Sequence, residues 1–188
     1  MDDRLAAAFS AVPRERFLPP EQRPHAHWDQ PLRLSHGQTS SQPTTVANML
    51  ELLDVRPGQR ILDVGAGSGW TTALLAHLVG EEGRVFGVER IAELRDQAAA
   101  AVEDWHWADV LLATPGVIGL PALAPFDRIL VSAEARSMPE SLVEQLESGG
   151  VMVIPVRGVM MRVVRGDGDG EDTVTRHGWY SFVPLIED

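Results

Sequence analysis

The residues with the clearest chemical potential form a glycine-rich turn that directly follows an apolar run, Arg60–Val64. Glycine adopts positive φ without the steric penalty of a Cβ atom, and it lets the backbone approach a ligand closely. The helix predicted over 70–79 would direct its unpaired amide groups to the same place. Strand, turn and helix in this order predict a nucleotide-cofactor site with these binding candidates: Gly65, Ala66, Gly67, Ser68 and Gly69.

Two further details indicate which cofactor this turn would bind. The dinucleotide pattern G-x-G-x-x-G requires a third glycine at position 70, where this chain has Trp70. Asp63, near the end of the strand, would repel a pyrophosphate but suits the cationic amino group of S-adenosylmethionine. The residues therefore favour a methyl-donor site over a NAD site, and a turn whose glycines serve packing alone is the alternative.

A second carboxylate, Glu89, stands at the end of the next predicted strand, 84–88. An acid in this place can accept hydrogen bonds from both ribose hydroxyls of a nucleoside. Its other interpretation is an acid in the first turn of a helix, stabilised by the helix dipole. Arg90 is included among the cofactor-binding candidates because it adjoins Glu89, although its position also suits a surface residue.

The surrounding periodicity predicts an α/β fold with a doubly wound, Rossmann-like parallel sheet. Helical spacing of apolar residues begins near Ser41 or Gln42, and continuous apolar runs predict strands that are buried on both faces. Ser137 has capping-box spacing before a predicted helix that carries Leu142 and Leu146, with Gly149-Gly150 at its end. The predicted strands are 60–64, 84–88, 109–113, 127–132 and 151–156.

The two ends of the chain depart from this alternation. Residues 160–164 and 173–186 predict a C-terminal antiparallel hairpin, joined by the acidic turn 166–170. Counted from Asp167, an EF-hand would need glycine and glutamate where Asp172 and Gly178 stand, so we expect no calcium site and no other metal. The proline-rich N-terminal segment predicts a loop-rich cap over 1–42, on a Rossmann-like core over 43–188, within a single domain.

Composition narrows the range of partners. The formal net charge is −11 with only 16 Lys and Arg, which disfavours binding to nucleic acid or to an anionic membrane. The absence of cysteine excludes disulfides and thiolate nucleophiles. No leader and no apolar run long enough to span a membrane is present, so we expect a cytoplasmic protein, and we take a monomer as the default.

Four blocks of the sequence resemble the protein-L-isoaspartate O-methyltransferase family. The block that is uncommon in other methyltransferases is Gly37-Gln38-Thr39-Ser40-Ser41-Gln42-Pro43. The remaining blocks are Val12–Phe17 with Pro19-Pro20, Asp63–Gly69 with Glu89, and a set of closing segments formed by Ala124–Asp127, Gly149-Gly150, Ile154–Val156 and Phe182–Leu185. The resemblance covers nearly the whole chain and implies a class I methyltransferase fold.

The resemblance also implies an activity, a substrate and site residues. The activity is transfer of a methyl group from S-adenosyl-L-methionine to the free carboxylate of an L-isoaspartyl residue in a damaged protein or peptide. Ser41 matches the serine assigned to the active site of the family, and Thr39 and Ser40 join the cofactor-binding candidates. Ser41 is also placed where it could cap the following helix, and the two roles are compatible.

Departures from the family pattern leave two alternatives open. The family has a Gly-Asp-Gly turn whose aspartate contacts adenine, and this chain has Thr114-Pro115-Gly116 there. Its Pro-Val-Gly pattern is replaced by Pro155-Val156-Arg157. The first alternative is a divergent carboxyl methyltransferase that acts on another carboxylate. The second is a binding protein that has kept the fold and lost turnover.

Overall fold

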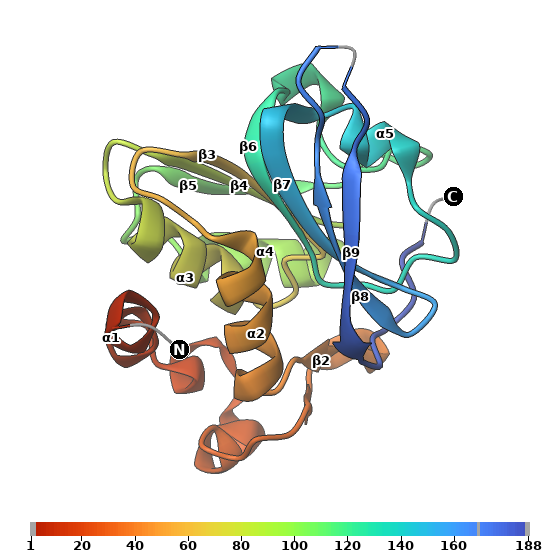
Figure 1. The fold of residues 1–188 in the computed structure, drawn as a ribbon. Coiled ribbons are helices and arrows are strands. Elements are labelled where there is room, and N and C mark those ends of the chain that lie inside the picture. Colours follow the sequence, from red (N-terminus) through yellow and green to blue (C-terminus); the bar gives the residue numbers. More distant parts are fainter. Residues whose placement is uncertain (1–2, 169, 187–188) are drawn as a thin grey trace.

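The computed structural model describes residues 3–168 and 170–186, and its main feature is a seven-stranded sheet in the order β5-β4-β3-β6-β7-β8-β9 (Figure 1). The five strands from β5 to β7 are parallel, whereas β8 and β9 are antiparallel to their neighbours. The strands are β3 Arg60–Val64, β4 Arg84–Glu89, β5 Ala108–Leu112, β6 Phe126–Val131, β7 Leu146–Val156, β8 Val159–Val164 and β9 Thr173–Trp179. The predicted parallel sheet with a C-terminal antiparallel hairpin is confirmed.

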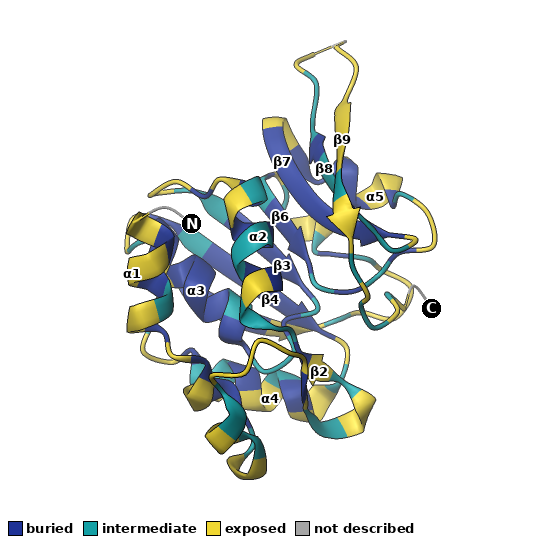
Figure 2. Cartoon of the chain, turned by 60° about the horizontal axis from the view of Figure 1, so that its bottom comes forward, coloured by how far each residue is buried: buried dark blue, intermediate teal, exposed yellow. Residues whose placement is uncertain are grey.

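Helices cover the two faces of the sheet unequally. On one face, α2, α3 and α4 pack against apolar side chains such as Ile61 and Val85, and α1 lies over α3 (Figure 2). Because α3 lies between the sheet and α1, it is buried on nearly every side. The other face is covered by α5 and by loops. The helices are α1 Asp3–Ala11, α2 Pro43–Leu53, α3 Trp70–Val79, α4 Ala92–Ala101 and α5 Glu140–Val143.

The helix predicted after Ser137 is wrong in length. Its observed counterpart, α5, has four residues and no side-chain cap, and Leu146 is the first residue of β7. Gly149 and Gly150 lie in an irregularity of β7 rather than at a helix end, because the pairing with β6 shifts there. Gly149 has φ +71°, and a Cβ on Gly150 would lie 2.7 Å from a backbone oxygen. These glycines therefore permit a bulge.

The last predicted strand also ends early. β9 ends at Trp179, and the chain then crosses to the end of β6, where Pro184 pairs with Glu134. Leu185 N donates to Glu134 O at 2.8 Å, which holds this segment beside the carboxyl ends of the parallel strands. Asp169 of the predicted acidic turn lies outside the described residues.

The N-terminal segment differs from a plain loop. The sequence pattern missed α1, which buries Leu5 and Ala8. Three short 3-10 helices, Arg14–Phe17, Pro20–His25 and Ser35–Gly37, follow it. A two-stranded antiparallel pair, β1 Leu32–Arg33 and β2 Thr39–Ser40, then leads into α2.

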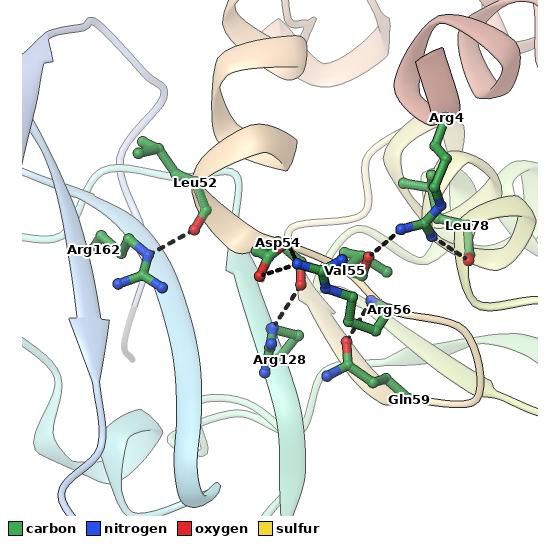
Figure 3. A network of polar contacts seen from close by, with 9 residues as sticks. All are labelled: Arg4, Leu52, Asp54, Val55, Arg56, Gln59, Leu78, Arg128 and Arg162. Atoms are coloured by element: carbon green, nitrogen blue, oxygen red, sulfur yellow. Dashed lines mark hydrogen bonds and ion pairs between the residues drawn. The ribbon is translucent and has the colours of Figure 1, made fainter. Parts of the chain in front are cut away.

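Arginine side chains fix the C-terminal end of α2, where helix carbonyls lack intrahelical partners (Figure 3). Arg162 Nε donates to Leu52 O at 2.8 Å, and Arg128 Nε donates to Asp54 O at 3.3 Å. Arg4 of α1 donates to two further carbonyls nearby, each at 3.3 Å. The cationic groups also suit the negative end of the helix dipole. The helix that follows Ser41 is thus held at its far end by the sheet and by α1.

Two features are absent from residues 3–168 and 170–186, the part of the chain that the structure describes. None of their helices is both long and apolar enough to cross a membrane. Among the same residues, no three His, Asp or Glu side chains gather as a metal ion would require.

Candidate cofactor and acceptor site

A single cavity brings the predicted site residues together at the carboxyl ends of the parallel strands. It lies where β3 is flanked by β4 on one side and β6 on the other, the place where open α/β sheets bind ligands. The predicted residues that line it are Thr39, Ser40, Ser41, Gly65, Ala66, Gly67, Ser68, Glu89 and Arg90. Asp63 and Gly69 do not line the cavity, so the cofactor contacts predicted for these two residues stay predictions.

The glycine turn has the backbone geometry that the sequence predicts. Gly65, Gly67 and Gly69 have φ values of +80°, +56° and +87°. A Cβ on Gly67 would lie 3.8 Å from Leu34 and 4.0 Å from Gly65 O, both ordinary contact distances, so the surface of the turn is open toward the cavity. A Cβ on Gly69 would lie 3.2 Å from Ala98, so this glycine serves the close approach of α4 instead. The predicted turn therefore has one face for a ligand and one for packing.

Glu89 is buried, with 6% of its surface exposed, and it holds the turn in place. Its Oε2 accepts a hydrogen bond from Gly67 N at 2.9 Å, and its Oε1 accepts one from Ile91 N at 2.9 Å. Each carboxylate oxygen can accept further hydrogen bonds. The interpretation of Glu89 as an acid in the first turn of a helix is wrong, because Glu89 is the last residue of β4 and α4 begins at Ala92. Glu89 lines the cavity, and its predicted hydrogen bonds to ribose hydroxyls stay a prediction.

Asp63 is fully buried beneath the turn, where Thr71 and Thr72 donate to its Oδ2 at 2.8 and 2.7 Å. Its Oδ1 has no hydrogen-bond partner in the structure. Burial raises the pKa of Asp63 to about 6, against the opposing effect of the two threonine hydroxyls. Thr71 lines the cavity, and its hydroxyl proton is engaged by the carboxylate, so its free lone pairs are available to accept from a cationic amino group.

The predicted capping role of Ser41 is wrong, because another residue caps α2. The cap position is Gln42, and Asp29 accepts from Thr44 N at 2.9 Å and from the Thr44 hydroxyl at 2.7 Å. The carboxylate thus satisfies the helix start from a distant part of the sequence. Ser41 lines the cavity, and its predicted role toward an acceptor stays a prediction.

Ser40 and Thr39 belong to β2 and form the wall beside Ser41. Ser40 is buried, and its hydroxyl accepts from Arg14 Nε at 3.1 Å, so this side chain also anchors the strand. Arg90 is exposed and lines the cavity. The cofactor contacts predicted for Thr39, Ser40 and Arg90 stay predictions.

Much of the apolar lining was not found from the sequence. Leu34, Ile118, Val183 and Leu185 come from three separate segments outside the main strands and helices and lie around the cavity. They carry no chemical motif, and only their position in the fold brings them together. The sequence analysis also missed Thr71. Its position at the start of the helix that follows β3, the strand that contains Asp63, could have indicated a contact with that carboxylate.

The loop that lacks the family's aspartate presents Val117 and Ile118 to the cavity, while Pro115 lies outside the lining. We expect Pro115→Asp to tighten cofactor binding about three- to tenfold, because it restores one acceptor, and one hydrogen bond is worth about 0.5–1.5 kcal/mol. Isothermal titration with S-adenosylhomocysteine measures this change. Unchanged or weaker binding would mean that this loop recognises adenine through apolar contacts alone.

The sheet order, the glycine turn and the acid at the end of β4 together define a class I S-adenosylmethionine-dependent methyltransferase. The whole chain, residues 1–188, matches the family model described as Protein-L-isoaspartate(D-aspartate) O-methyltransferase (PCMT). The chain therefore belongs to this family, and its cofactor is S-adenosylmethionine.

Individual relatives agree with this assignment. The chain is 48% identical to the protein-L-isoaspartate O-methyltransferase of Methanopyrus kandleri, over 98% of this chain and 84% of the relative. It is 44% identical to the enzyme of the same name from Thermococcus onnurineus, over 98% and 86%. Among solved structures, a Plasmodium falciparum protein of this family in complex with S-adenosyl-L-homocysteine superposes with a TM-score of 0.87. Its sequence is 25% identical, and the match covers 100% of this chain and 92% of that one.

Proposed function

We propose that this chain methylates the free α-carboxylate of L-isoaspartyl residues in damaged proteins or peptides. The observation that carries the proposal is the place of Ser41, which lines both the cofactor cavity and an adjoining groove. A chain segment bound in the groove could therefore present a carboxylate toward the cofactor turn. Family membership supports the same acceptor chemistry.

The residues of the site suit a reaction that needs alignment rather than a strong base. A carboxylate is already an anion at neutral pH, with a pKa near 4, so no general base is required. S-adenosylmethionine supplies an electrophilic methyl group on a sulfonium. The opposite charges of the acceptor and the sulfonium diminish as the reaction proceeds, so the apolar walls formed by Val117, Ile118 and Leu185 favour it by excluding water. Ser41 would orient the acceptor through a hydrogen bond.

The cofactor residues have distinct proposed roles. Gly65, Ala66, Gly67 and Ser68 would contact the methionine half through the backbone of the turn, and Glu89 would accept from the ribose hydroxyls. Residues 1–42 would act as a cap on the core, 43–188, within one domain. A monomeric state, a cytoplasmic location, a role in protein repair, and the absence of nucleic-acid and membrane partners remain proposals from sequence and composition.

A matched pair of peptides tests the acceptor. An L-isoaspartyl peptide should be labelled by methyl-labelled S-adenosylmethionine. The same peptide with a normal aspartyl residue should be labelled less than about a hundredth as fast, because its carboxylate has the same chemistry but is not held in line with the methyl group. Equal labelling would favour the divergent carboxyl methyltransferase. Binding of S-adenosylhomocysteine with no labelling of either peptide would favour the binding protein.

Ser41→Ala should lower kcat/KM for the isoaspartyl peptide about tenfold to a hundredfold, because a hydrogen bond to a charged group is worth about 1.5–3 kcal/mol. Cofactor affinity should change little. Ser137→Ala, at an exposed serine outside the cavity, is the control and should retain full activity. A Ser41→Ala enzyme as active as the parent would remove Ser41 from the acceptor site.

A further inference from the structure

A groove beside the cofactor cavity extends away from Ser41 toward the end of β9. The two hollows share Thr39, Ser41, Ser132 and Val183 in their walls. The far wall of the groove is formed by residues of α2 and by the segment 179–183. A peptide whose reactive carboxylate reached Ser41 would therefore lay its neighbouring residues along this groove.

Trp179 stands in the far wall with 82% of its surface exposed, more than any other large apolar side chain among residues 3–168 and 170–186. It is the last residue of β9, the outermost strand of the sheet, and it pairs with Val159 (Figure 1). One edge of its ring lies beside the β7–β8 turn, because a Cβ on Gly158 would approach the ring to 3.7 Å. The ring is thus supported on one side and open on the other.

The chemistry of the groove selects among possible occupants. None of the described residues that line it carries a charge: apart from Trp179 and apolar side chains, they offer hydroxyl and amide groups, such as those of Thr45, Asn48 and Ser181. The Tyr180 hydroxyl is already engaged, since Asn48 Nδ2 donates to it at 3.1 Å. An indole is a large, rigid surface whose immobilisation costs little conformational entropy, which suits recognition of apolar groups. A charged occupant would lose hydration without gaining an ionic partner.

We propose that Trp179 is the platform of a specificity subsite that accepts an aromatic or large aliphatic side chain of the acceptor, close in sequence to the isoaspartyl residue. This inference rests on the proposed function. The apolar side chain would stack on the open face of the indole while the carboxylate lies beside Ser41. The subsite would therefore make the enzyme prefer damaged sites that have an exposed apolar neighbour.

Peptides that differ at one position test the subsite. Each carries one isoaspartyl residue, and Phe, Leu, Ala or Lys is placed in turn at each of the two positions before and after it. We expect kcat/KM for the Phe and Leu peptides to exceed that of the Ala peptide about tenfold at one of these positions, mainly through KM. Trp179→Ala should reduce this ratio to about one, and Trp179→Phe should retain part of it. Trp28→Ala removes an exposed indole outside the groove and should leave the ratio unchanged.

Each other outcome overturns the inference. Equal kcat/KM for Phe and Ala peptides at every position excludes an apolar subsite, with no variant required. A preference for the Lys peptides would mean that the Trp179 indole binds a cation rather than an apolar side chain. A preference for Phe that remains in Trp179→Ala would mean that the subsite lies elsewhere. If the parent enzyme methylates none of the peptides, the proposed function fails and the inference fails with it, whereas methylation without preference defeats the inference alone.

Discussion

Replacing Arg14 with Met is expected to lower the free energy of unfolding by about 3–5 kcal/mol, because it leaves several buried carbonyls without donors. Arg14 is 5% exposed, and each of its five N–H groups has an acceptor. Nε donates to the Ser40 hydroxyl, Nη2 donates to Ser40 O at 2.9 Å and Gln30 O at 3.1 Å, and Nη1 donates to Trp28 O at 3.1 Å and Ala26 O at 3.4 Å.

The same side chain links the cap to the cofactor cavity. Its guanidinium carbon lies 5.4 Å from the centre of the Trp70 ring, at the start of α3. Burial lowers the pKa of Arg14 to about 10, which leaves it charged at neutral pH. Since Ser40 and its neighbours form one wall of the cavity, we expect Arg14→Met to weaken S-adenosylhomocysteine binding as well as stability. Arg14→Lys should recover little, because one ammonium cannot supply five donors in a planar arrangement.

Arg16 provides the matched control for this prediction. It lies two residues away in the same 3-10 helix, but its ion pair with Asp104, at 2.9 Å, is exposed. Arg16→Met should therefore cost no more than about 1 kcal/mol. Urea denaturation of the parent protein, Arg14→Met and Arg16→Met measures the loss of unfolding free energy in each variant. Equal losses for Arg14→Met and Arg16→Met would show that the buried network contributes no more than a surface ion pair.

The parts of the site that could be predicted from sequence are those in which neighbouring residues determine the geometry. The glycine turn and Glu89 belong to this kind, since a strand, a turn and the next strand end suffice to place them. Asp29 could not be assigned as the cap of α2, because it lies 15 residues from Thr44 and only the folded cap brings them together. The same holds for the contacts between Arg14 and Ser40.

The errors in the predicted fold also arise where the outcome depends on contacts between distant parts of the chain. Gly149-Gly150 after an apolar stretch indicates the end of a helix as well as it indicates a bulge, and only the pairing of β7 with β6 decides. The loop around Pro115 shows what a family pattern cannot predict. The family pattern assigns the altered turn to residues 114–116, but it cannot say that Val117 and Ile118, rather than Pro115, line the cavity.

Asp63→Asn should produce two opposite changes, a gain of stability in the free protein and a loss of cofactor affinity. The folded-state pKa of Asp63, about 6, exceeds the ordinary value near 4 because the carboxylate is buried. Its contribution to stability is therefore fully present below about pH 4 and is lost as the pH rises through 6, a change of at most about 3 kcal/mol. At pH 7 the neutral amide avoids that cost. We expect a net gain of about 1 kcal/mol, because the amide accepts less well from the two threonines.

Cofactor binding should show the reverse dependence on the charge of Asp63. The cationic amino group would be held through the Thr71 hydroxyl, which the ionised carboxylate polarises. S-adenosylhomocysteine, which carries the same amino group, should thus bind the parent protein more tightly as the pH rises from 5 to 7. Asp63→Asn should lower the affinity at pH 7 about tenfold to a hundredfold and abolish this rise. Titration calorimetry at several pH values measures both effects.

A control variant separates this buried charge from the general charge of the protein. Asp54 is exposed at the end of α2, in the left-handed conformation that Asn tolerates, so Asp54→Asn removes one carboxylate without strain. It should leave the pH dependence of cofactor binding as it is in the parent. If Asp63→Asn bound the cofactor as tightly as Asp54→Asn, the buried carboxylate would serve only to hold the threonines. The free-energy cost of burying the charge of Asp63 would then not be offset by tighter cofactor binding.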